Sequence, residues 1–262
     1  MKDLNEIRKL QTIDNLPLLA KQTVEGFITG LHKSPYHGFS VEFAEHRLYN
    51  KGESTKHIDW KLYARTDRLY VKRYEEETNL RCRLVIDTSS SMYFPEPDGI
   101  NNKLAFSLYS AASLIYLLKK QRDAAGVTLF SNQIEFHSKI GLSDAHTKML
   151  FAEMNHLLNR GKPKDRKATG IAENLHRIAE TTHKRSLVVI FSDLLDNTPP
   201  EEIFSALRHL RYNKHEVILF HVTDFAKEAL FEYQNRPHKF VDMETGESIS
   251  INPGEIKSSF KQ

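Results

Sequence analysis

The feature that most constrains the fold is a regular alternation of short apolar runs and amphipathic segments after residue 83. Residues 84–86, 126–130, 186–191 and 216–222 are apolar runs of strand length, and the segments between most of them repeat apolar residues at helical spacing. Strands that alternate with helices form parallel sheets with right-handed crossovers. The sequence therefore predicts a doubly wound, mostly parallel α/β fold.

One pair of strands departs from this pattern. Residues 134–140 follow the strand at 126–130 after only Ser131, Asn132 and Gln133, which leaves room for a tight turn. We therefore expect one antiparallel strand at an edge of the sheet. The tail, with apolar runs at 240–243 and 248–251, predicts a second small hairpin. The expected helices cover residues 101–122, 144–159, 171–178 and 199–211.

The first 80 residues have a different texture. Leu4 to Thr29 has helical periodicity, which Pro17 is expected to divide into two short helices. Residues 39–43 and 69–74 alternate in the manner of half-exposed strands. We expect residues 1–80 to form N-terminal helices and a small strand-bearing attachment, and residues 81–262 to form the α/β domain.

The composition suits a globular protein with a sizeable core, since 40% of the residues are hydrophobic and 27% are charged. A formal charge of +3 is too mild to indicate nucleic-acid binding by itself. The single cysteine, Cys82, begins an apolar strand, which favours a buried thiol in a reducing compartment. No stretch approaches membrane-spanning length, so we expect a cytoplasmic protein without membrane contact.

The segment Asp87-Thr-Ser-Ser-Ser91 places a carboxylate and hydroxyls directly after the first strand of the α/β domain. Ligands of open α/β sheets bind beyond the carboxyl ends of the strands, and hard divalent cations prefer oxygen ligands. The alternative is that these side chains cap the next helix and satisfy loop amides, and the segment alone does not decide.

Two more oxygen ligands are expected at the same edge. Thr169 opens the helix at 171–178, and Asp193 follows the strand at 186–191. Together these residues resemble the metal-ion-dependent adhesion site of von Willebrand factor A domains. In that family two serines and a threonine coordinate the cation, and the aspartates act directly or through water. The resemblance implies a divalent metal, Mg²⁺ first and Mn²⁺ or Ca²⁺ as alternatives, with these ligands: Asp87, Ser89, Ser91, Thr169 and Asp193.

A second resemblance covers the chain from about Leu31 to its C-terminus. The segments 38–52, 57–65 and 69–77 resemble a bacterial domain-of-unknown-function family, number fifty-eight, whose genes commonly accompany MoxR-type AAA+ ATPases. Its members carry this attachment ahead of a von Willebrand A-like domain. Many also have N-terminal membrane helices and an extra β-domain, so we expect this chain to resemble the short soluble form.

These resemblances imply a non-catalytic adaptor. A cation with an open position can accept an Asp or Glu of a partner, here a MoxR-type ATPase or its client. Basic residues could steer an acidic partner toward the metal, although their spacing alone favours a solvated loop and a salt-bridged surface. The candidate partner-binding residues are Arg160, Lys162, Lys164, Arg166 and Lys167 in one loop, with Arg47 and Arg65 in the attachment.

Two other functions stay open. A Mg²⁺-dependent phosphoesterase would use Asp87 as nucleophile. Against it, no glycine-rich phosphate cradle is present, and position 89 is serine where haloacid-dehalogenase-like phosphatases have a second aspartate. A nucleic-acid-binding module would use the basic loop, but the near-neutral charge balance argues against it.

Overall fold

The computed structural model describes residues 16–27, 40–50, 55, 58–77, 80–95, 101–161, 166–196 and 198–256. Contacts divide the chain into two compact units, one of residues 32–80 and one of residues 1–31 together with 81–262. Among the described residues, no helix is both long enough and apolar enough to cross a membrane.

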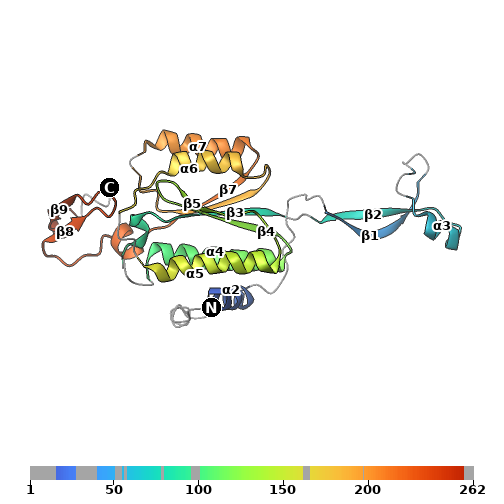
Figure 1. The fold of residues 1–262 in the computed structure, drawn as a ribbon, viewed down its shortest axis with the longest axis horizontal. Helices are drawn as coiled ribbons and strands as arrows, with labels where there is room; N and C mark the ends of the chain where they lie inside the picture. The colour runs from blue at the N-terminus through green and yellow to red at the C-terminus, as the bar shows by residue number, and fades with distance from the viewer. Residues whose placement is uncertain are drawn as a thin grey trace. The chain divides into compact units, whose positions relative to one another are not determined.

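The larger unit is built on a five-stranded sheet with the strand order β5-β4-β3-β6-β7 (Figure 1). β3 lies in the centre and pairs in parallel with both β4 and β6, while β7 is parallel to β6 and β5 is antiparallel to β4. The predicted α/β class and the antiparallel edge strand are confirmed. The strands are β3 (Arg81–Asp87), β4 (Ala124–Phe130), β5 (Ile134–His137), β6 (Leu187–Ser192) and β7 (Glu216–His221).

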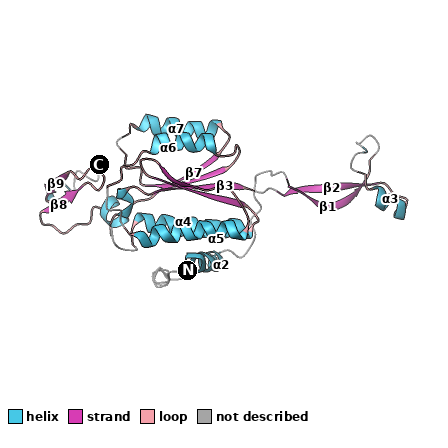
Figure 2. Ribbon diagram, in the orientation of Figure 1, coloured by secondary structure: helices cyan, strands magenta, loops and turns pink. Residues whose placement is uncertain are grey.

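Helices cover both faces of this sheet. α4 (Lys103–Lys120) and α5 (Asp144–Arg160) lie on one face, and α6 (Ile171–Thr181) and α7 (Pro200–Tyr212) lie on the other (Figures 1 and 2). A strand covered on both faces is rich in apolar residues, and Leu84, Val85 and Ile86 of β3 are fully buried. β3 ends at the buried Asp87, directly before the serine-rich loop.

The N-terminal helix α2 (Leu16–Phe27) packs against α4. Leu16, Leu19, Ala20 and Val24 form its buried face. The predicted boundary at residue 80 assigns this helix to the attachment, but its apolar face is buried within the α/β unit. Pro17 is the second residue of α2, in the first helical turn, where a proline costs no hydrogen bond. The expected helix before residue 16 lies outside the described residues.

The smaller unit is a hairpin of β1 (Ser40–Leu48) and β2 (Tyr70–Glu77), joined by a segment that contains α3 (Trp60–Thr66). Asp59 caps α3 by accepting hydrogen bonds from the amides of Lys61 and Leu62, each 3.0 Å long. The two strands that the sequence predicts in this region correspond to β1 and β2.

Five further elements complete the larger unit. A short 3₁₀ turn, η2 (Ser90–Tyr93), follows β3, and a π-helical turn, η3 (Phe225–Ala229), follows β7. The predicted tail hairpin is present as β8 (His238–Val241) and β9 (Ser248–Ile251), which pair only with each other within the described chain. α8 (Pro253–Ile256) ends the described chain.

Candidate functional site

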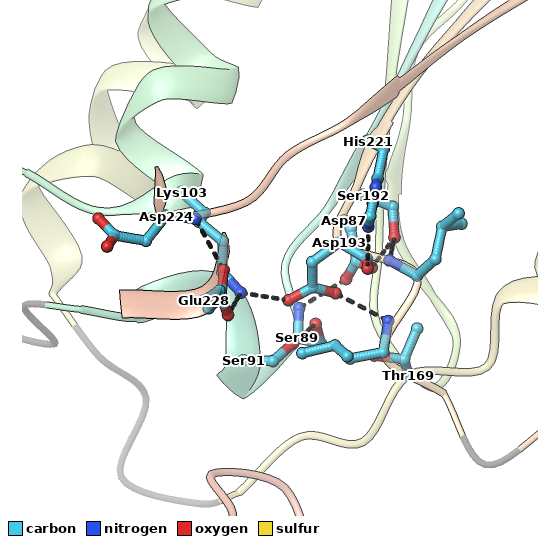
Figure 3. Close-up of polar contacts among 12 residues, drawn as sticks. Asp87, Ser89, Ser91, Lys103, Thr169, Ser192, Asp193, His221, Asp224 and Glu228 are labelled. Carbon is cyan, nitrogen blue, oxygen red and sulfur yellow. Dashed lines mark hydrogen bonds and ion pairs between the residues drawn. The ribbon is translucent and has the colours of Figure 1, made fainter. Parts of the chain in front are cut away.

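Three loops meet at the carboxyl ends of β3 and β6 (Figure 3). The loop after β3 is tied to the segment before α6 by two hydrogen bonds: the Ser90 amide donates to the Lys167 carbonyl at 3.0 Å, and the Lys167 amide donates to Ser90 Oγ at 2.8 Å. The Gly170 amide donates to the carbonyl of Ser131 at 3.0 Å, which fixes the same segment to the end of β4. Thr169 is therefore held beside the serine loop by backbone contacts.

Asp87 lies at the centre of this edge and is fully buried. Its Oδ1 accepts the Ser89 amide at 2.9 Å, and its Oδ2 accepts the Ser192 hydroxyl at 2.7 Å. The hydroxyls of Ser89 and Ser91 are 3.0 Å apart. Burial, with a smaller contribution from the charge of Asp193, raises the pKa of Asp87 to about 7.

Asp193 is the second buried carboxylate. Its Oδ2 lies 2.8 Å from Nζ of Lys103, the first residue of α4, and its Oδ1 accepts the Leu195 amide at 3.1 Å. The same ammonium group contacts Oε1 of Glu228 at 2.6 Å. The Asp193 carbonyl is 3.0 Å from Nε2 of His221. Asp193 is therefore fixed through both its backbone and its side chain (Figure 3).

A third carboxylate comes from the turn between β8 and β9. Glu244 accepts two hydrogen bonds from Thr169, one from the hydroxyl to Oε1 at 2.8 Å and one from the amide to Oε2 at 3.1 Å. Burial raises the pKa of Glu244, and the hydroxyls of Thr169 and Ser91 oppose that rise. Contacts through these side chains bring together the predicted metal ligands, namely Asp87, Ser89, Ser91, Thr169 and Asp193.

The chemistry of these donors suits a hard divalent cation. All of them are hydroxyl or carboxylate oxygens, which Mg²⁺ prefers. Among the described residues neither Asp87 nor Glu244 has a cationic partner, so the buried edge carries negative charge that a cation would balance. Within the same ranges no group of three or more His, Cys, Asp or Glu side chains is arranged to hold a metal ion. A cation here would therefore depend on the hydroxyls as well as the carboxylates.

A family model described as "Protein of unknown function DUF58" matches residues 45–262. The chain belongs to the DUF58 family. Uncharacterised proteins from Mycobacterium bovis and Mycobacterium tuberculosis are each 24% identical to this DUF58 chain over 222 residues, which cover 85% of the chain and 67% of each relative. The crystal structure of conserved hypothetical protein BatB from Bacteroides thetaiotaomicron is similar at 14% identity over 69% of this chain and 84% of that chain, with a TM-score of 0.45.

The basic residues predicted to bind a partner have different environments in the DUF58 chain. Arg160 is exposed at the end of α5, whereas Lys162 and Lys164 lie outside the described residues. Arg166 donates from Nη1 to the Thr245 carbonyl at 3.1 Å, and the Lys167 ammonium pairs with Glu135. The last two therefore contact their own chain.

In the smaller unit, Arg65 is exposed in the last turn of α3. Arg47 lies in β1, opposite Val71 of β2. The side chain of Arg47 lies outside the described part of the structure. A role for these basic residues in partner binding stays a prediction.

Four residues that complete the site of the DUF58 chain are missing from the sequence prediction: Lys103, Ser192, Glu228 and Glu244. Two of them carry a sequence signal. A lysine in the first turn of a helix is unfavourable for the helix dipole, which indicates that Lys103 has a partner of its own. Ser192 could have been found from its place directly before Asp193 at the end of a strand. The two glutamates carry no local signal, because long-range folding brings them to the site.

Proposed function

We propose that this DUF58 chain is a metal-dependent protein-binding adaptor. The proposed ligands of the cation are Asp87, Ser89, Ser91, Thr169 and Asp193, as in the von Willebrand A-like site that the sequence resembles. The observation that carries the proposal is the convergence of two buried carboxylates and three hydroxyls at one sheet edge, where Asp87 lacks a cationic partner among the described residues. Bound there, Mg²⁺ would supply positive charge and a coordination position for an outside oxygen.

The partner that fits this chemistry presents an Asp or Glu side chain. A carboxylate bound to a cation at a partly buried edge gives specificity, and the surrounding surface adds affinity. The resemblance to the domain-of-unknown-function family supports a MoxR-type AAA+ ATPase, or a client protein of that ATPase, as the partner. Arg160 is exposed at the end of α5, and it remains a candidate for steering such a partner.

Binding accounts for the geometry of Asp87 better than catalysis does. A carboxylate that attacks phosphorus needs an accessible oxygen with a free lone pair directed at the substrate. Asp87 has no exposed surface, so neither of its oxygens is accessible to the phosphorus of a substrate. No contact of the described residues specifically favours a phosphoesterase or a nucleic-acid-binding module.

Calorimetric titration with Mg²⁺ and Mn²⁺ tests the metal site. We expect the wild-type chain to bind one equivalent of metal, and the variants Asp87→Ala and Thr169→Ala each to weaken binding. Asp144→Ala is the matched control, since this exposed carboxylate pairs with Lys119, about 24 Å along the α4 axis from Lys103. Equal metal affinity in the wild type, the control and both site variants would contradict the proposal.

Capture of a purified MoxR-type ATPase by the immobilised chain tests the adaptor role. We expect capture in the presence of Mg²⁺, loss of capture after addition of EDTA, and loss of capture with Asp87→Ala but not with Asp144→Ala. Capture that survives both EDTA and Asp87→Ala would remove the metal from the interaction.

A further inference from the structure

We propose that Glu244 is an internal carboxylate ligand of the metal centre and that an acidic partner must displace it in order to bind. The inference rests on the proposed metal site and adds a ligand and a control step to it. Asp87, Asp193 and Glu244 are not arranged as a three-carboxylate site among the described residues, so Glu244 would join the centre only once the cation is bound. Glu244 belongs to the turn between β8 and β9, 75 residues after Thr169 in the sequence. The chain would thus carry its own substitute for the acidic residue of a partner.

The contacts of Glu244 are those of a ligand at this site. Its two oxygens accept the amide and the hydroxyl of Thr169, and Ser91 lines the same cavity as Glu244. Thr169 and Ser91 are two of the three proposed hydroxyl ligands. A hydroxyl has one hydrogen to donate and two lone pairs, so a hydroxyl that donates to Glu244 keeps its lone pairs available for a cation. Glu244 and a cation can therefore share the Thr169 hydroxyl.

The turn that carries Glu244 is held in a defined conformation. Asp242 Oδ1 accepts the amides of Glu244 and Thr245 at 2.7 and 3.1 Å, and the Gly246 amide donates to the Asp242 carbonyl at 3.0 Å. Gly246 has a φ of +81°, and a Cβ at this position would lie 1.2 Å from Nη1 of Arg166. The turn is thus shaped to lie directly against Arg166.

Arg166 connects this turn to the metal edge. It lies three residues before Thr169, and its guanidinium donates to the Thr245 carbonyl at 3.1 Å. The segment that supplies one metal ligand therefore also holds the turn that supplies Glu244. This second contact holds the turn in place in addition to the hydrogen bonds between Glu244 and Thr169.

The surroundings allow the turn to be displaced. A cavity of about 730 Å³ lies beside Glu244, with Ser91, Lys103 and Glu228 among its polar lining residues and Leu194 and Ile249 among its apolar ones. β8 and β9 form a sheet of their own, so movement of the hairpin breaks no hydrogen bond of the five-stranded sheet. The cavity is large enough to admit an acidic side chain of a partner together with an adjacent apolar side chain.

An internal ligand changes the affinity for an external one. A tethered carboxylate acts at an effective concentration in the millimolar range, so it competes with any free carboxylate for the same coordination position. A site that its own ligand occupies for about 90% of the time binds an outside ligand about 10-fold more weakly than an open site. Removal of Glu244 should therefore lower metal affinity and raise affinity for outside carboxylates.

The test uses the full chain loaded with Mn²⁺ and reads the water ligands of the bound ion by water-proton relaxation. In Glu244→Gln we expect Mn²⁺ affinity to fall about 10-fold, the size of effect seen when a group supporting a metal is lost, and the relaxation enhancement to rise as water fills the vacant position. Acetate added to Glu244→Gln should lower the enhancement again, because it displaces that water. Wild type should respond to acetate about 10-fold less strongly.

Two further variants complete the test. Glu247→Gln changes an exposed acidic residue of the same turn and should behave as wild type in all three measurements. Arg166→Ala keeps the carboxylate but frees the turn, so its acetate response should lie between those of wild type and Glu244→Gln. Wild-type Mn²⁺ affinity, relaxation and acetate response in Glu244→Gln would overturn the inference while leaving the metal site intact. Absence of Mn²⁺ binding in the wild type would instead overturn the metal site, and the inference with it.

Discussion

The ammonium group of Lys103 lies 2.8 Å from Oδ2 of Asp193, and both side chains are almost completely buried, with exposed fractions of 2% and 1%. Nζ of Lys103 also contacts Glu228 at 2.6 Å. A positive charge of the chain itself therefore lies inside the proposed metal centre. Lys103 compensates Asp193 when no cation is bound, and it would compete with a cation for that carboxylate.

Lys103→Met tests this role. Removal of one partner from a buried ion pair leaves an uncompensated charge and typically costs about 3–5 kcal/mol. We expect a loss of that size in the free energy of unfolding in EDTA, measured by denaturant titration. Added Mg²⁺ should recover more stability in Lys103→Met than in wild type, because the cation then supplies the missing charge to Asp193.

Lys119→Met is the matched control on the same helix, since Lys119 pairs with Asp144 at exposed fractions of 41% and 78%. An exposed pair contributes at most about 1 kcal/mol, so this variant should lose little stability and gain nothing from Mg²⁺. Similar losses in the two variants would argue against a special role of Lys103.

The sequence predicts the α/β framework because local patterns carry the information. Continuous apolar runs specify strands covered on both faces, and the short spacing before residue 134 specifies the antiparallel edge strand. The five proposed ligands follow from the same logic, since Asp87 and Asp193 end strands and Thr169 precedes a helix. Loops at the carboxyl ends of neighbouring parallel strands meet whatever their side chains are.

The remainder of the site depends on contacts that no local pattern encodes. Glu244 lies in a turn signalled by Thr245 and Gly246, and nothing in that signal indicates that the turn reaches Thr169. The place of Lys103 in the first turn of α4 indicates a partner, but it does not indicate that the partners are Asp193 and Glu228. The burial of α2 against α4 is of the same kind, because periodicity identifies an apolar face without identifying its partner.

The thiol of Cys82 should be unreactive in the folded chain. Its side chain is 1% exposed, and burial raises its pKa to about 12, so little of the reactive thiolate forms at neutral pH. We expect a thiol reagent to label Cys82 at pH 8 only as fast as the sheet opens, and to label the unfolded chain immediately. The single variant Lys184→Cys, which adds a second cysteine at an exposed position, gives the rate for an accessible thiol. Equal labelling rates for the two cysteines would show that β3 is not closed.

The stability of the chain should fall in mild acid partly because of His215. This side chain is 5% exposed, its Nδ1 accepts the Ser186 amide at 3.3 Å, and burial lowers its pKa. The unfolded state then takes up the proton first, so the stabilisation is present above the ordinary pKa of about 6.5 and is lost as the pH falls through the lowered value.

Unfolding free energies of wild type and His215→Asn, measured in EDTA across this range, test the effect. The variant should have lower stability at pH 8 and a smaller loss on acidification. Burial also lowers the pKa of His137, so part of the acid dependence should persist in the variant. Replacement of the exposed His156 by Asn is the control, and a variant of His215 with the full wild-type acid dependence would rule this residue out.

Asp87→Asn should weaken metal binding and raise the stability of the metal-free chain. Burial and the charge of Asp193 raise the pKa of Asp87 from 3.8 to about 7, so without metal the ionised side chain destabilises the fold increasingly as the pH rises between these values. Asparagine keeps an oxygen that can accept the Ser89 amide and removes the charge. In EDTA at pH 8 we expect the variant to be more stable than wild type, by at most about 4 kcal/mol at 1.36 kcal/mol per pKa unit. At pH 4 the two should differ little.

Saturating Mg²⁺ should reverse the order of the two melting temperatures, because only wild type can bind the cation with both carboxylates and be stabilised by it. Thermal denaturation of the two proteins in EDTA and in Mg²⁺ therefore forms a crossed experiment. For Asp144→Asn, the order of melting temperatures relative to wild type should be the same in EDTA and in Mg²⁺, since its exposed carboxylate lies at the far end of α4 from the site. A variant that is less stable than wild type in EDTA would mean that Asp87 is already compensated in the folded chain, and the charge argument for a cation at this edge would fail.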